Sequence, residues 1–369
     1  MRRLALCAAA LVALALLAGC ATLLLDTARP QLDGRITGLP VTGRVDVLRD
    51  SHGIPHIFAS SERDLWVAQG FVHAQDRMWQ METLRRLTDG RLSEIAGRRT
   101  AAMDVFCRLL GLADMKRRML ADLSPAELSA LQAYSEGVNA YLRMRGRDLP
   151  VEFSSLGYIP EPWKPVDSLS FLALLSWEMV FGHYTEEVVA LARGASFTEA
   201  EWNDAFPSWP NTELPRETFF DAQSHLLLGK LIPAALCFHF GLDDKDSAEA
   251  LQKRLFSQAS PGGGSNNWVV ASSADGLPLL ANDPHLGVTL PATWYMCHVS
   301  CPGLNAAGVS VAGTPGIVLG RNEHVAWGAT NTMIDGADTV IFRVDPADPE
   351  RYVAGGREYR MERQEIVLR

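Results

Sequence analysis

The strongest constraint on the fold is a change of hydrophobic periodicity at residue 265. From Ser60 to about Arg145 apolar residues recur at helical spacing, and residues 167–194 predict a further long helix with breaks at Gly182 and Tyr184. Helices first and strands afterwards indicate an α+β fold. After residue 264 short apolar runs predict strands at 268–271, 277–281, 292–299, 308–312 and 339–344, and residues 364–368 are strand-like too.

Local signals also define the first elements of the chain. Arg44–Asp50 alternates in the manner of a strand, Gly53–Pro55 predicts a turn, and His56–Ala59 predicts a second short strand. Two helix starts are predicted by N-cap signals, at Ser61 with Asp64 and at Ser124-Pro125-Ala126-Glu127. The chain should therefore enter its helical half directly after a pair of strands.

The first 25 residues predict an export segment. Arg2 and Arg3 precede an apolar run from Leu4 to Leu25, as in a secretory signal. Within this run, Leu17-Ala18-Gly19-Cys20 resembles the lipobox of bacterial lipoproteins, which would make Cys20 the lipidated residue. A plain membrane anchor is the alternative, because a mostly apolar run of this length just spans a bilayer. Both interpretations place the rest of the protein in the periplasm, anchored to the membrane.

Composition and charge exclude one class of partner. Apolar residues make up 47% of the 369 residues, which is enough to fill a sizeable core. The formal net charge is −9, and nucleic-acid phosphates need a basic face. We therefore expect no nucleic-acid partner.

The cysteines predict free thiols. Cys297 and Cys301 would share one face of a strand roughly 13 Å apart, too far for a disulfide. Metal ligation by these two thiols with His298 is disfavoured, because no second ligand pair stands at zinc spacing. Together with Cys107 and Cys237 they are expected to be free thiols.

The histidines of the first half predict structural roles. His52, His56 and His73 stand near Asp76, but satisfied structural histidines are favoured over a metal site. Asp76 and Arg77 are candidates for a buried ion pair, which the sequence leaves open.

A glycine run directly before a serine suggests self-cleavage. Gly262-Gly263-Gly264 allows the backbone a strained turn, and Ser265 follows at once. The Ser265 hydroxyl can attack the carbonyl of Gly264, shift the acyl chain from N to O, and leave an ester that hydrolyses. The freed serine would then hold a nucleophile and a base, because its own α-amino group, with a pKa of about 7.7–8.0 in small peptides, can accept the hydroxyl proton. From the glycines alone, a hinge before a strand is the alternative.

Further motifs on both sides of the Gly264–Ser265 junction narrow its interpretation. Five segments follow one another along the chain, at Arg49–Ile57, His73–Trp79, Gly264–Trp268, Asn282–Gly287 with Pro291 and Trp294-Tyr295, and Gly320–Asn331. Together they resemble the penicillin acylase family of N-terminal-nucleophile hydrolases, over about residues 30–369. The sequence Gly-Ser-Asn-Asn-Trp at 264–268 matches the opening of that family's second subunit.

The resemblance implies a set of catalytic roles. Ser265 would be the nucleophile, and the cut would fall between Gly264 and Ser265. The backbone N–H of Asn331 would donate to the tetrahedral oxyanion. Asn266 would orient the α-amino group. His285 stands where penicillin G acylase has a glutamine and where cephalosporin and acyl-homoserine-lactone acylases have histidine, and it could bind that amino group; a strand-end histidine without such a role is the alternative.

The resemblance also implies a metal site and a substrate pocket. Asp335 and Asp338 would bind a structural calcium with Glu187, or with Glu186 instead, and no organic cofactor is expected. Calcium needs six to eight oxygen ligands, and solvated surface carboxylates are the alternative. The acyl pocket would be lined by Met179, Phe181, Leu286 and Ala329, each of which could equally be a core residue.

The family implies a four-layer αββα core, with strands from both sides of the cut in shared sheets. We expect an anchor at 1–25, a mainly helical first subunit at 26–239, a spacer at 240–264, and the start of a second subunit at 265–369. Family members run several hundred residues further, so the chain is interpreted as a truncated precursor lacking the family's second oxyanion asparagine.

The expected function is a self-processing acylase that hydrolyses a secondary amide. Its partners would be a small-molecule amide, its own second subunit in a heterodimer, and the membrane through the anchor. An acyl-homoserine-lactone acylase is the alternative within the class. A catalytically inactive periplasmic binding homologue is the alternative from another class.

Overall fold

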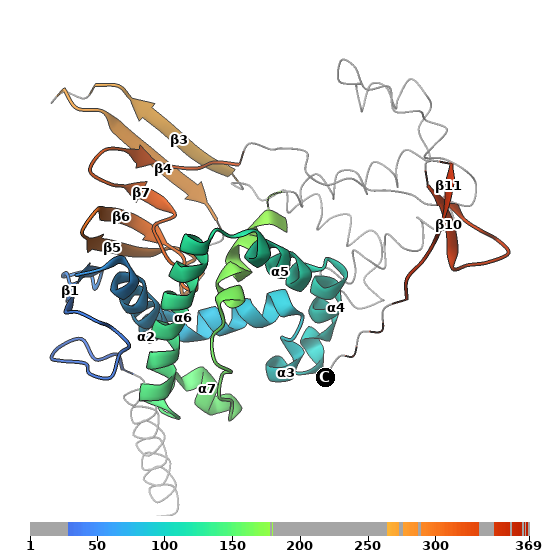
Figure 1. Ribbon diagram of the computed structural model, residues 1–369, viewed down its shortest axis with the longest axis horizontal. Coiled ribbons are helices and arrows are strands. Elements are labelled where there is room, and N and C mark those ends of the chain that lie inside the picture. Colours follow the sequence, from blue (N-terminus) through green and yellow to red (C-terminus); the bar gives the residue numbers. More distant parts are fainter. Residues whose placement is uncertain are drawn as a thin grey trace, which may run out of the picture.

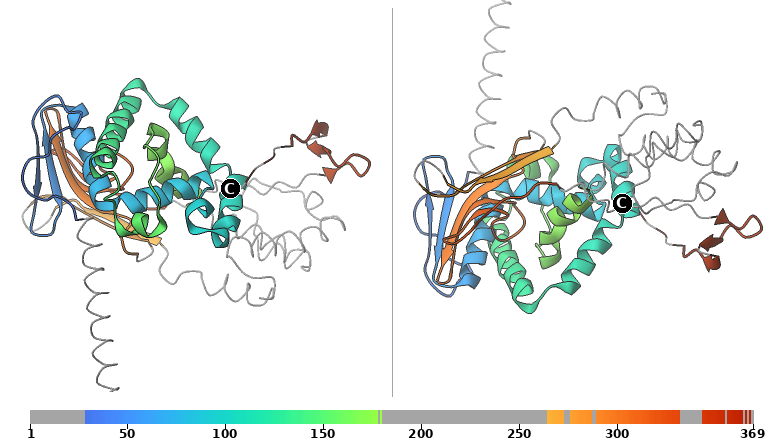
Figure 2. Two further views of the ribbon diagram at one scale, coloured as in Figure 1. Left: turned by 90° about the horizontal axis from the view of Figure 1, so that it is seen from below. Right: turned by 90° about the horizontal axis from the view of Figure 1, so that it is seen from above.

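A computed structural model shows helices covering one face of a mixed sheet (Figures 1 and 2). The α+β class expected from the sequence is confirmed, whereas the four-layer core stays a prediction. The structure describes residues 29–177, 179, 264–272, 276–286, 289–331, 343–354, 356–363, 365 and 367.

The largest sheet joins strands from both sides of residue 265. Its order is β1-β2-β5-β6-β7-β8, and β2 pairs in parallel with β5 so that His56 lies opposite His298. The other neighbours are antiparallel. The expectation of a sheet shared across residue 265 is therefore confirmed. The six strands are β1 (Val45–Arg49), β2 (Pro55–Ala59), β5 (Tyr295–Cys301), β6 (Leu304–Ser310), β7 (Leu319–Arg321) and β8 (Ala326–Trp327).

Helix α2 (Glu62–Asp89) runs along the inner face of this sheet and supplies much of the core. The Ser61 side chain accepts a hydrogen bond from the Asp64 N–H, so the predicted helix start is confirmed. The Asp64 carboxylate in turn accepts from the N–H groups of Thr42 and Gly43, and these bonds lower its pKa despite its burial. The helix start is thus fixed to the segment that leads into β1.

Helix α6 (Pro125–Arg145) crosses α2 at close range. Its start is a complete capping box between Ser124 and Glu127, as predicted. Two glycines allow the contact: a Cβ at Gly137 would lie 1.9 Å from the Val67 carbonyl oxygen, and a Cβ at Gly70 would lie 2.1 Å from that of Tyr134. Backbone therefore packs directly on backbone at this crossing.

Shorter helices extend the helical layer beyond the sheet (Figure 1). The helix predicted over 167–194 is seen from Ser170 to Trp177, after a 3-10 turn, and its remainder lies outside the described residues except Met179. The shorter helices are α3 (Ser93–Ala96), η1 (Arg98–Thr100), α4 (Ala101–Leu109), α5 (Leu112–Asp122), α7 (Val151–Leu156) and η2 (Pro165–Leu169).

The remaining strands form two small sheets. Strand β3 (Gly264–Val270) pairs with β4 (Leu279–His285), and β9 (Arg343–Val344), β10 (Arg351–Ala354) and β11 (Arg357–Arg360) form a separate sheet. The strand expected at 268–271 thus begins at Gly264, because pairing with β4 outweighs the low strand propensity of asparagine. At the strand-like end, Glu365 and Val367 lie outside any strand.

The described polar groups answer one question that the sequence left open and confirm one expectation. Asp76 pairs with Arg49, not with Arg77; Arg77 donates instead to the carbonyl of Ala292. His73 is fully buried between Tyr134 and Ser310, as expected for a structural histidine.

The three described cysteines are free thiols, as predicted. Burial raises the pKa of both Cys107 and Cys297 to about 12, so these thiols stay protonated. Cys301 is partly exposed, and Cys237 lies outside the described residues.

Within the described ranges, no helix has the length and apolar character needed to cross a membrane. The export segment, including Cys20, lies outside these ranges.

Candidate functional site

The β3–β4 hairpin carries three of the four residues expected to be catalytic, Ser265, Asn266 and His285. In its antiparallel register Gly264 faces His285, Ser265 faces Pro284, and Asn266 faces Asp283. Ser265 is partly buried, whereas Asn266 and His285 are exposed. The predicted nucleophile therefore lies at the start of a strand, beside two polar side chains from the same hairpin.

One imidazole nitrogen of His285 lies within hydrogen-bonding distance of two side chains, those of Asn266 and Asp283. Nε2 of His285 lies 3.4 Å from Nδ2 of Asn266 and 3.1 Å from Oδ2 of Asp283. A protonated Nε2 donates to Asp283, whereas an unprotonated Nε2 accepts from Asn266. The tautomer of His285 therefore decides which neighbour it binds, and Asp283 is a partner that the sequence analysis did not assign.

The segment after β8 is held on this hairpin by Asn282. Its Oδ1 accepts from the Ala329 N–H at 3.0 Å, and its Nδ2 donates to the Ala329 carbonyl at 3.0 Å and the Asn266 carbonyl at 2.9 Å. One side-chain amide thus joins β3, β4 and the predicted oxyanion segment.

A second contact fixes the same segment to the nucleophile residue itself. The Thr330 hydroxyl donates to the Ser265 carbonyl at 3.0 Å. The next residue, Asn331, donates from its side-chain amide to the Met179 carbonyl at 3.3 Å. The structure therefore brings Ser265, Ala329, Asn331 and Met179 into one region.

The structure gives less information about the other predicted site residues. Leu286 is partly buried at the end of β4. Phe181, Glu187, Asp335 and Asp338 lie outside the described residues, so the calcium site and part of the acyl pocket stay predictions. Among the residues that are described, no group of three or more His, Cys, Asp or Glu side chains could hold a metal.

The sequence analysis gave no role to Asn282 or Thr330, although both lie within quoted motifs. The available signal was composition: asparagine is depleted in strands, yet Asn266, Asn267 and Asn282 all lie in this hairpin. Asparagines in paired strands indicate side-chain hydrogen bonds rather than packing.

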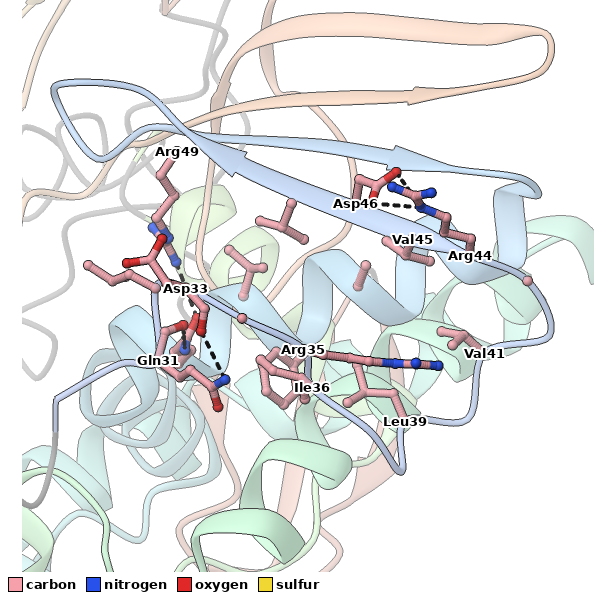
Figure 3. Close-up of a pocket in the computed structure, with 18 of the residues that line it drawn as sticks. Gln31, Asp33, Arg35, Ile36, Leu39, Val41, Arg44, Val45, Asp46 and Arg49 are labelled. Atoms are coloured by element: carbon pink, nitrogen blue, oxygen red, sulfur yellow. Dashed lines mark hydrogen bonds and ion pairs between the residues drawn. The ribbon is translucent and has the colours of Figure 1, made fainter.

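A cavity among the described residues lies away from the hairpin. It has a volume of about 810 Å³ and lies between residues 31–49 and α2 (Figure 3). Its wall combines apolar side chains such as Ile36 and Leu39 with charged ones such as Arg35 and Asp33. None of the predicted catalytic residues lines it, so it is distinct from the hairpin site.

Comparison with known proteins identifies the family. The penicillin amidase family profile matches residues 44–369, and the chain belongs to the penicillin amidase family. It is 33% identical over 330 residues to the acyl-homoserine lactone acylase QuiP of Pseudomonas aeruginosa, covering 88% of this chain and 38% of that protein. It is 34% identical over 347 residues to the penicillin acylase 2 proenzyme of a Pseudomonas species, covering 91% and 42%.

Two further matches have lower sequence identity. Penicillin G acylase of Escherichia coli is 28% identical over 369 residues, covering 89% of this chain and 43% of that protein. A solved thermostable penicillin G acylase from Alcaligenes faecalis is 26% identical, with a TM-score of 0.40 over 47% of this chain and 98% of that one. The chain spans about two fifths of the length of the curated relatives it matches.

Proposed function

We propose that the complete protein is a self-processing amidohydrolase whose N-terminal nucleophile is Ser265. Family membership supports the reaction class. The observation that carries the assignment of Ser265 is the hairpin geometry: the segment containing Thr330 and Asn331 is bonded to the carbonyl of Ser265. A nucleophile and an oxyanion donor must lie close together for acyl transfer.

The first reaction is cleavage of the protein's own chain. The Oγ of Ser265 attacks the carbonyl carbon of Gly264, the new C–O bond forms, and the C–N bond breaks. The hydroxyl proton passes to the departing nitrogen, which becomes the α-amino group of Ser265. Water then hydrolyses the ester, leaving a carboxylate on Gly264 and a free hydroxyl on Ser265.

The second reaction repeats acyl transfer on a substrate amide. The neutral α-amino group accepts the proton of the Ser265 hydroxyl and later delivers it to the leaving amine, and water hydrolyses the acyl-enzyme. The Asn331 N–H stabilises the oxyanion, a contact worth about 2.7–4 kcal/mol in comparable sites. Asn266 and His285 orient the amino group.

The substrate is a secondary amide with an apolar acyl chain. Met179, Leu286 and Ala329 offer apolar surface near the hairpin, in keeping with an aromatic or aliphatic acyl group. A penicillin-acylase-like activity is the first candidate. The similarity to QuiP favours an acyl-homoserine-lactone acylase as the second candidate.

Export and calcium are further parts of this proposal. The basic and apolar N-terminus supports export with lipidation of Cys20, or a plain anchor. Glu187, Asp335 and Asp338 are proposed as ligands of a structural calcium, on the family resemblance alone.

The test is N-terminal sequencing of the full-length protein and its Ser265→Ala variant. The wild type should give two pieces, the second beginning Ser-Asn-Asn-Trp. Ser265→Ala should stay one chain and release no amine from N-acyl nitroanilides of graded acyl length. Ser265→Cys should still cut, because a thiol can make the same shift, but should turn over poorly.

Ser300→Ala, on β5, is the matched control and should behave as wild type. A single wild-type chain would instead favour the inactive binding homologue. A second piece with a different first residue, or cleavage that survives in Ser265→Ala, would overturn the assignment of Ser265.

A further inference from the structure

Asn282 uses both its donor hydrogens and its acceptor oxygen at the junction of three segments. Its amide meets the N–H and the C=O of Ala329 at 3.0 Å each, in the manner of a neighbouring strand. The second hydrogen of Nδ2 binds the Asn266 carbonyl at 2.9 Å. An asparagine amide offers two donors, so both are used, and an apolar replacement would leave three backbone groups without these partners.

Gly328 shows that the fit around this amide is tight. A Cβ at residue 328 would lie 2.8 Å from Oδ1 of Asn282 and 2.9 Å from Oδ1 of Asn267. Real Cβ atoms do not approach other atoms so closely, so any side chain there must move the segment or the amides. Glycine is needed here for space.

The two contacts of the segment lie directly before the proposed oxyanion donor in the sequence. Asn282 holds Ala329, Thr330 holds the Ser265 carbonyl, and Asn331 follows immediately. An oxyanion donor must lie about 2.7–3.1 Å from the developing charge. A displacement of about 1 Å can cost on the order of 100-fold in rate, so we expect the loss of one of the two contacts to impair catalysis.

We propose that Asn282 is a positioning residue for the oxyanion: it sets the distance between the Asn331 N–H and the Ser265 hydroxyl without touching substrate. The inference rests on the proposed function of Ser265. Because the oxyanion exists only in the transition state, the loss should fall on kcat while KM is retained.

The test compares three variants of the full-length protein, with rates expressed per mole of the piece that begins at Ser265. Asn282→Leu removes the amide at similar volume. Gly328→Ala displaces the same segment while leaving Asn282 and Ser265 intact. Asn305→Leu is the matched control, since Asn305 also makes two side-chain hydrogen bonds, to His298 and Glu323, on a different sheet.

The measured quantities are kcat and KM for an N-acyl nitroanilide, and the inhibition constant of a boronic acid with the same acyl chain, in which boron replaces the carbonyl carbon. A boronic acid forms a tetrahedral adduct on the serine Oγ and therefore reports the oxyanion geometry directly. Asn282→Leu and Gly328→Ala should each lose on the order of 100-fold in kcat, with KM retained and boronate binding weakened in parallel. Asn305→Leu should match the wild type.

Different failures point to different conclusions. Wild-type kcat in Asn282→Leu, or reduced kcat with unchanged boronate binding, overturns the role of Asn282. If Asn282→Leu is not processed, Gly328→Ala decides by the same criteria. Turnover in Ser265→Ala overturns the proposed function itself, whatever Asn282 does.

Discussion

Removing the guanidinium of Arg49 should destabilise the protein by about 3 kcal/mol. Arg49 binds both carboxylate oxygens of Asp76, at 2.8 and 3.0 Å, and the two side chains are only 12% and 15% exposed. Burial alone would lower the pKa of Arg49, but the hydrogen bonds and charges of Asp76 and Tyr295 together outweigh burial and raise that pKa. Breaking a buried pair costs about 3–5 kcal/mol, because the remaining charge is uncompensated. The lower end applies since the Tyr295 hydroxyl still donates to Asp76.

The assay is urea unfolding of Arg49→Leu in the uncut Ser265→Ala background, so that one covalent chain is compared throughout. Arg44→Leu is the control, because its partner Asp46 is at the surface and Arg44 is 84% exposed; such pairs contribute little. Adding Asp76→Leu to Arg49→Leu should recover part of the loss by removing the orphaned carboxylate. Equal effects of Arg49→Leu and Arg44→Leu, or strict additivity in the double variant, would refute the reasoning.

Two further predictions concern the core. Burial lowers the pKa of His73 to about 3, with the charge of Arg77 adding to the effect. Between about pH 6.5 and 3 the imidazole of His73 therefore binds a proton in the unfolded chain but not in the folded protein, and the free energy of unfolding should fall by about 1.4 kcal/mol per pH unit as the pH drops. Acid unfolding of His73→Asn should show a shallower dependence on pH, whereas His324→Asn, at an exposed position, should keep the wild-type dependence. Gly137→Ala should lower the free energy of unfolding by about 1–3 kcal/mol or more, because the added methyl group overpacks α2 against α6. Ser129→Ala, at an exposed position of α6, is the control and should not destabilise the protein. Equal thermal midpoints for the two variants would contradict the tight crossing.

Local signals in the sequence were sufficient to locate the starts of α2 and α6. Ser61 and Ser124 mark their N-caps because capping depends on residues within one turn. The parallel pairing of His56 with His298 had no such signal. It joins residues far apart in the sequence, and the hydrophobic pattern of each strand is compatible with several neighbours. The shared sheet was expected only from the family resemblance.

The difference between local signals and long-range contacts also explains which parts of the candidate site could be predicted from the sequence. Ser265 could be located because a glycine run and a serine are adjacent. The contacts of Asn282 and Thr330 join residues 47 and 65 positions apart and involve backbone groups. Residue type can indicate that such asparagines make side-chain hydrogen bonds, but not which backbone groups they bind. The sequence left a pair between Asp76 and Arg77 open, and it does not form, because consecutive helix residues do not face each other. The partner of Asp76 came from β1 instead.

Cleavage after Gly264 would leave the two pieces held together by contacts already present across residue 265. The buried Gln69 amide binds both the N–H and the carbonyl of Gly316, at 2.8 and 3.0 Å. The Tyr134 hydroxyl accepts from the Gly313 N–H at 2.9 Å. With the β2–β5 ladder, these bonds tie the helices of the first piece to the sheet of the second.

The bond proposed for cleavage lies in the two-stranded β3–β4 sheet and not in the six-stranded sheet. The reaction can therefore free the α-amino group of Ser265 without breaking a contact of the core. The described core is thus suited to remain assembled while the new N-terminus becomes available for catalysis.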